Sequence, residues 1–145
     1  MDSKFYANLI YLIILLAIYI ILVIAEIRIF KKAGEKGYKA LIPIYNIYVS
    51  HHIVGMGHVW FIIELVLWAG EITTVWVNLN HTVELVFSVI TIVFTAACEI
   101  VHAIKMCKCF GKGKGFKIGI VLLPEVFLPI IAFGKAEYKK ETSNS

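Results

Sequence analysis

The sequence predicts an all-α integral membrane protein with about four transmembrane helices, the fourth proline-broken or re-entrant, plus an interfacial segment after the first. Hydrophobic residues make up 60% of the 145 positions, whereas soluble domains are nearer about 45–50% apolar. A domain of this size leaves much of its surface exposed, so it cannot bury that many apolar side chains. Long apolar runs and an uneven distribution of lysines support the same conclusion, and we expect a single membrane domain whose solvent is lipid.

The first predicted span covers residues 7–30, a run that is apolar over most of its length. At the rise of an α-helix it is about 36 Å long, enough to cross a bilayer with some tilt. The start of the chain is only weakly basic, the run is too long, and no small-residue cleavage site follows it, which argues against a signal peptide. We therefore expect a retained helix.

Residues 38–57 are apolar and aromatic, but polar residues and Pro43 interrupt them. Tyr45 and Tyr48 suit the headgroup level of a bilayer, where amphipathic rings settle. We expect this segment to be interfacial or re-entrant. The histidines His51, His52 and His58 then lie near the interface, where we expect solvated side chains; pH sensing or metal binding is the alternative.

Three further apolar segments follow, and the chain ends in a polar tail. The spans are predicted at residues 58–78, 83–106 and 117–134, and the tail at 135–145. The last span is short and contains Pro124 and Pro129, so it either crosses as a kinked helix or enters the membrane and returns.

Lysine and arginine gather after the first span and between the third and fourth spans, and are missing between the second and third. Basic connections stay in the cytoplasm, which places the N-terminus outside. The C-terminus lies outside if the fourth segment crosses, but the lysines of the tail favour the re-entrant alternative.

The turn FGKGKGFKIG, residues 110–119, resembles a phosphate-binding loop only superficially. A P-loop follows a strand and has Ser or Thr after its lysine, and neither holds here. We expect a cytoplasmic turn whose lysines bind anionic lipid headgroups or a partner protein. These lysines are Lys108, Lys112, Lys114 and Lys117. The three cysteines provide too few ligands for a zinc site, and we expect no cofactor and no nucleic-acid partner.

Acidic residues inside the predicted spans are the strongest candidates for function, because ionisable groups at membrane depth are costly. They are Glu26, Glu64, Glu71, Glu99 and Glu125, with His102 three positions after Glu99. Except for Glu71, which lies further out, the acids fall about 6 to 12 Å from the cytoplasmic ends of their segments. Such a layer either binds a cation or relays protons, or it joins the helices by hydrogen bonds.

A metal site is a weaker interpretation of the same residues. Glu99 and His102 form one E-x-x-H pair, whereas the di-metal sites of four-helix bundles use two such pairs. No motif of a hydrolase or protease occurs, and we expect no enzymatic activity.

Two blocks of the sequence, FKKAGEKGYKALIPIYNIY and FGKGKGFKIGIVLLPEVFLPIIAFGKAEY, resemble a family of small multi-pass bacterial membrane proteins of unknown function. The resemblance implies a bacterial cytoplasmic membrane, and the family domain also occurs fused to signal peptidase I. Residues 55–105 and Glu125 depart from the family pattern, so the resemblance implies no activity and no functional residues.

Two functions remain open. The first is a small channel or transporter, formed by an oligomer, that handles protons or other cations through the acidic layer. The second is an accessory or scaffold subunit that binds partner membrane proteins through its basic face, for example in protein export or processing.

Overall fold

The computed structural model describes residues 3–77 and 80–140, and the described chain is helical, with no strand. Its elements are α1 (Ser3–Lys32), the 3-10 helix η1 (Gly37–Leu41), α2 (Pro43–Ile53), α3 (His58–Val77), α4 (His81–Cys109), α5 (Lys114–Leu122) and α6 (Pro124–Phe133). Asn78, where the second span was predicted to end, and residues 141–145 of the predicted tail lie outside the described residues.

Two of the described helices, Lys4–Lys32 and His81–Cys109, are long and apolar enough to cross a membrane. Only 6% and 11% of their most apolar windows are buried inside the protein. The core helix of a soluble protein would be mostly buried, so these helices present their apolar side chains outward. This arrangement supports the predicted membrane character of the chain.

The last turns of α1 are part of the protein core. Ala25, Ile29 and Phe30 are buried against α2, the end of α4 and the C-terminal helices. A cleaved leader has no such partners, so the packing agrees with a retained first helix.

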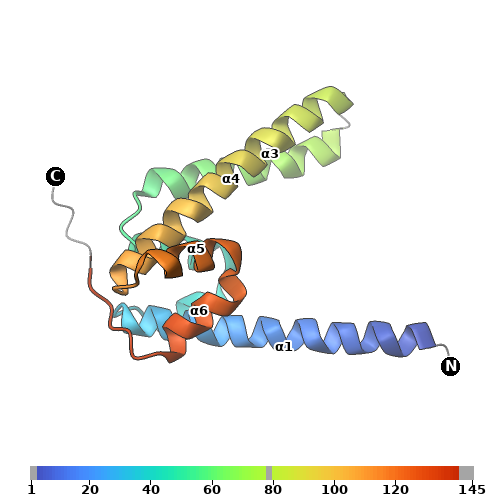
Figure 1. Ribbon diagram of the computed structural model, residues 1–145. Coiled ribbons are helices and arrows are strands. Elements are labelled where there is room, and N and C mark those ends of the chain that lie inside the picture. The colour runs from blue at the N-terminus through green and yellow to red at the C-terminus, as the bar shows by residue number, and fades with distance from the viewer. Residues whose placement is uncertain (1–2, 78–79, 141–145) are drawn as a thin grey trace.

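Helix α3 pairs with α4 in an antiparallel hairpin (Figure 1). At Gly70 the two helices approach closely, because a Cβ atom there would collide with the ring of Phe87. Figure 1 shows that α1 diverges from this hairpin, so the long helices meet only at the end of the molecule that holds the core.

The predicted fourth span is two short helices rather than one kinked helix. Helix α5 ends at Leu122, and Leu123 lies between it and Pro124, the first residue of α6. A proline disfavours helical geometry in the residue that precedes it. Phe116 of α5 packs edge-to-face on Phe127 of α6 with ring centroids 4.8 Å apart. In a continuous helix these two residues would be about 16 Å apart along the axis, so the chain folds back on itself between α5 and α6.

The C-terminal residues lie at the same end as the lysine-rich connections. The Lys32 ammonium donates hydrogen bonds to the carbonyl oxygens of Ile131 at 2.7 Å, Gly134 at 2.8 Å and Ala136 at 3.1 Å. The backbone N–H of Lys139 donates to the Cys109 carbonyl at 2.7 Å. These contacts bring the residues that follow α6 back to the ends of α1 and α4.

Tyr138 connects the residues that follow α6 to α2. Its hydroxyl donates to the Ile53 carbonyl at 2.7 Å, and its ring packs against Phe110 at the end of α4. Burial raises the pKa of Tyr138, which keeps the phenol protonated and able to donate.

Glycine closes three of the helices in the same way. Gly34, Gly55 and Gly111 have φ angles of 82°, 68° and 62° and follow α1, α2 and α4. After Gly111, the Lys112 N–H bonds back to the Cys107 carbonyl at 2.7 Å. Left-handed geometry of this kind ends a helix sharply. Residues 110–113 form the reversal between α4 and α5, whereas residues 114–119 of the predicted turn belong to α5.

Candidate functional site

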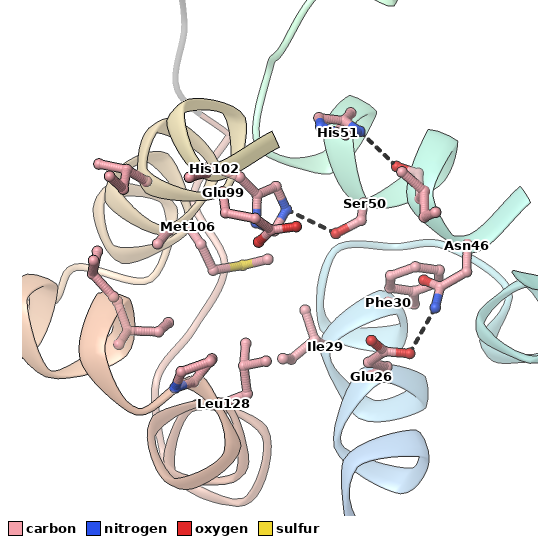
Figure 2. Close-up of a pocket in the computed structure, with 17 residues that line it drawn as sticks. Glu26, Ile29, Phe30, Asn46, Ser50, His51, Glu99, His102, Met106 and Leu128 are labelled. Atoms are coloured by element: carbon pink, nitrogen blue, oxygen red, sulfur yellow. Dashed lines mark hydrogen bonds between the residues drawn. The ribbon is translucent and has the colours of Figure 1, made fainter. Parts of the chain in front are cut away.

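A pocket of about 540 Å³ lies where the helices converge (Figure 2). Its walls come from α1, α2, α4, α5 and α6. Most of the wall is apolar, with Ile29, Phe30, Met106 and Leu128 among the lining residues, and the polar side chains come from α1, α2 and α4.

Glu26 lies on the α1 wall of the pocket, and one of its oxygens is held by α2. The Asn46 amide donates to Glu26 Oε2 at 2.7 Å (Figure 2). The other carboxylate oxygen remains available to a ligand. This carboxylate is therefore oriented by a neighbour and is not neutralised by an ion pair.

Glu99 and His102 line the opposite wall, on α4. Figure 2 shows the Glu99 carboxylate directed into the pocket, and its side chain is exposed there. His102 Nε2 is 2.8 Å from the Ser50 hydroxyl of α2. The predicted E-x-x-H pair thus faces the pocket, with the histidine tied to the neighbouring helix.

Glu64 reaches the pocket indirectly, through His51. Both side chains are buried, with exposed fractions of 5% and 6%, and His51 Nε2 is 3.8 Å from Glu64 Oε2. The expectation of a solvated His51 was wrong: α2 packs into the core and carries His51 with it, while His52 and His58 are exposed.

The backbone of α2 orients the ring of His51 toward Glu64. His51 Nδ1 is 2.9 Å from the Ile47 carbonyl oxygen. That oxygen can only accept, so Nδ1 carries a hydrogen. Nε2 then faces the Glu64 carboxyl, 3.8 Å from its Oε2. His51 therefore connects Glu64 to the ring of His102, whose centroid is 5.6 Å away.

Two acids of the predicted layer lie elsewhere. Glu71 is further along α3, where Ser88 of α4 donates to its Oε2 at 3.2 Å. Glu125, at the start of α6, is exposed and is not part of the pocket wall. The layer at the pocket therefore consists of Glu26, Glu99 and His102, with Glu64 behind His51.

Among residues 3–77 and 80–140, no group of three or more His, Cys, Asp or Glu side chains is placed to hold a metal ion. Glu99 and His102 provide two such groups, which is short of a structural metal site. The geometry gives no support to the metal interpretation of these residues.

The four lysines proposed for headgroups or partners lie around the reversal between α4 and α5. Lys108 and Lys114 are exposed, and Lys112 and Lys117 are partly buried. The Lys112 ammonium lies 5.1 Å from the centre of the Phe116 ring, within the range of a cation–π contact.

The sequence analysis did not select Asn46, Ser50 or His51 as site residues. Asn46 and Ser50 are four positions apart, so an α-helix places them on one face. That spacing was a usable signal, but the segment was expected to lie at the interface, where polar residues need no internal partner.

A family model matches residues 38–141, which include α2 to α6 and all the pocket residues except those of α1. The family is described as a family of unknown function, DUF5684. Neither the curated proteins nor the solved structures contain a match. Because the match covers more than half of its length, the chain belongs to the DUF5684 family.

Proposed function

We propose that this protein is a multi-pass membrane protein that binds a cation in the pocket and exchanges protons there. The observation that carries the proposal is that two carboxylates, Glu26 of α1 and Glu99 of α4, line one pocket. Carboxylates inside a membrane are costly unless a ligand, a proton or a partner compensates them. A cation between the two walls supplies that compensation.

The dimensions of the pocket favour an organic cation over a bare metal ion. A volume of about 540 Å³ falls within the range of small-molecule sites, about 300–1,000 Å³. A dehydrated Ca²⁺ or Mg²⁺ ion takes about six or more oxygen ligands, which two opposed carboxylates do not provide. An ammonium group between the carboxylates, with its apolar body against Phe30 and Leu128, fits both parts of the lining.

Proton exchange is assigned to the His51–Glu64 pair. The two side chains are buried directly behind the pocket wall, and His102 faces the same space. A change of charge in the pocket acts on them through a medium of low dielectric constant, where electrostatic effects are strong. Cation binding and proton release are therefore coupled in this proposal.

The proposed orientation follows the distribution of lysine. The lysine-rich connections and the C-terminal residues face the cytoplasm, and the N-terminus lies outside. Helices α1, α3 and α4 cross a bacterial cytoplasmic membrane, and α5 and α6 form a re-entrant pair. Lys112 and Lys114 then lie at the level of anionic headgroups.

Binding to the protein in lipid nanodiscs tests the pocket. Calorimetric titration with n-butylammonium, Na⁺, K⁺ and Mg²⁺ identifies the cation class, and 1-butanol controls for apolar partitioning. We expect n-butylammonium to bind, and Glu26→Gln and Glu99→Gln each to weaken binding by about tenfold or more, since a charge-assisted hydrogen bond is worth about 1.5–3 kcal/mol. The matched control is Glu125→Gln, an exposed acid outside the pocket. Equal affinity in all variants, or no binding of any cation, would refute the proposal.

A second candidate function rests on α1. From Phe5 to Ile21 its large hydrophobic side chains are exposed, and that part of the helix lies apart from the α3/α4 hairpin. An accessory subunit that packs this surface against a partner membrane protein or a second copy would use it. Crosslinking from Leu12 in native membranes separates the two functions, because a defined protein adduct that persists in Glu99→Gln favours the accessory role.

A further inference from the structure

Helix α4 carries a polar seam along the face that it turns to α3. Its members are Ser88, Thr91, Thr95, Cys98 and His102, separated by alternating steps of three and four residues. This spacing keeps side chains on one face of a helix over several turns. Two of them meet α3 acids directly: Ser88 bonds to Glu71, and Cys98 lies beside Glu64.

The α3 acids lie on the matching face. Glu64 and Glu71 are seven residues apart, or about 10.5 Å along the helix. Because the helices are antiparallel, Glu71 meets the seam near its start and Glu64 meets it near Cys98. Thr91 and Thr95 occupy the intervening two turns. The Thr91 hydroxyl donates to the Phe87 carbonyl of its own helix at 3.1 Å, which leaves its lone pairs to accept.

Two oxygens on the seam are buried without a hydrogen-bond partner among the described residues. They are Glu71 Oε1 and Thr95 Oγ1. Buried polar atoms almost always have a partner, above all at membrane depth. Hydrogen bonding that served only to join α3 to α4 would satisfy them within the pair. Both oxygens therefore have hydrogen-bonding capacity that the contact between α3 and α4 does not use.

We infer that the α3/α4 seam is a proton path that connects Glu71 with the Glu64–His51 pair at the pocket. Glu71 takes up a proton from the outer part of the hairpin and releases it along Thr91, Thr95 and water molecules between them. At each hop one O–H bond breaks as the next forms, so the net change is one proton lost by Glu71 and one gained by Glu64–His51. The inference rests on the proposed function, because it supplies the protons that the pocket exchanges.

At the inner end of the seam the proton meets groups from α2, α3 and α4. Glu64 and Cys98 face each other across α3 and α4, and His51 receives the proton at Nε2 because Nδ1 is bonded to the Ile47 carbonyl. His102 lies beyond, with its ring against His51. Glu99 of the pocket is on the same turn of α4.

Proton flux into proteoliposomes tests the path. The purified full chain is reconstituted with a pH-sensitive dye inside, and a K⁺ gradient with valinomycin drives protons inward. The test variants are Glu71→Gln and Thr95→Val. Their matched controls are Glu125→Gln, exposed at the start of α6, and Thr73→Val, exposed on α3 with its hydroxyl bonded to the Gly70 carbonyl within the same helix.

We expect flux in the wild type and both controls, and a fall of about tenfold or more in each test variant, which corresponds to an added barrier of about 1.4 kcal/mol. Thermal unfolding in detergent checks the fold, and Thr95→Val should be neutral or more stable, since it removes an unpaired buried hydroxyl. Loss of flux with an intact fold therefore identifies transport rather than packing.

Two results would overturn the inference: no flux above empty liposomes in the wild type, or equal flux in Thr95→Val, Glu71→Gln and their controls. The calorimetric titration keeps this outcome separate from the proposed function. Cation binding that depends on Glu99 but is not accompanied by flux through Glu71 would leave the pocket in place and remove the path.

Discussion

Replacement of Lys32 by methionine should release the C-terminal residues from the rest of the protein. The ammonium group of Lys32 donates to three carbonyl oxygens, those of Ile131, Gly134 and Ala136. They include the last carbonyls of α6, which have no partner within the helix. Methionine keeps the length and apolar stem of lysine and removes only the donor.

The magnitude follows from the three hydrogen bonds. Each bond to a charged group contributes about 1.5–3 kcal/mol when it is well made. The three share one ammonium, and the carbonyl at Gly134 is exposed, so water replaces part of the loss. We therefore expect a net destabilisation of about 2 kcal/mol for Lys32→Met.

Cysteine labelling reports this loss at the right place. Cys109 is 1% exposed and its carbonyl accepts from the Lys139 N–H, so opening of the C-terminal residues exposes its thiol. A local loss of about 2 kcal/mol raises the opened population about thirtyfold, since about 1.4 kcal/mol is a factor of ten. Maleimide labelling with peptide mass spectrometry measures the rate at Cys109 itself.

The control is Lys31→Met, which removes the neighbouring exposed lysine. Surface substitutions of this kind change stability by about 0.5 kcal/mol or less, so its labelling should match the wild type within about twofold. Equal rates in Lys32→Met and Lys31→Met would show that the ammonium of Lys32 does not hold the C-terminal residues in place.

Three other predictions concern single groups outside the pocket. Gly111→Ala should lose about 1–2 kcal/mol, because its φ of 62° is left-handed, whereas Gly113→Ala, with a φ of −72° and open space around it, should lose only a few tenths; equal losses in unfolding midpoints would contradict this. The hydrogen bond from Lys39 lowers the pKa of Glu35 from its ordinary value of 4.5. Glu35 therefore stabilises the fold fully at pH values above 4.5, and this contribution is lost as the pH falls through the lowered pKa. Glu35→Gln should therefore cost less than about 1 kcal/mol at neutral pH and nothing in acid, and a cost that persists at low pH would refute the assignment. Tyr138→Phe removes a donor to an α2 carbonyl and should cost about 1 kcal/mol, measured by chemical unfolding; an unchanged midpoint would show that the bond adds nothing.

Properties that depend on short stretches of sequence could be predicted directly. The long apolar runs required helices, because a backbone in lipid must satisfy its own hydrogen bonds, and α1, α3 and α4 begin and end within a few residues of the expected limits. Pro124 fixed the break in the last segment, and Gly111 fixed the end of α4. In each case the relevant interaction lies within a few residues along the chain.

The site could be predicted only in part. The acids were found because charge inside an apolar run is visible in the sequence. Their grouping was not, because the estimate of depth gave height along each helix and no information on the direction in which a side chain points. Glu125 is exposed and is not part of the pocket wall, whereas His51 was assigned to solvent and lies buried beside Glu64.

The sequence by itself determined that this chain is helical, that its surface is apolar and that its basic connections share one side. Hydropathy and charge are properties of short stretches of sequence, and each stretch can be interpreted without knowledge of the others. Only the tertiary structure decided that α5 and α6 return to Lys32, that α2 packs inward, and that Glu26 and Glu99 face one pocket. These features arise from contacts between residues far apart in the chain, where packing of one helix against another selects among arrangements that the local pattern allows equally.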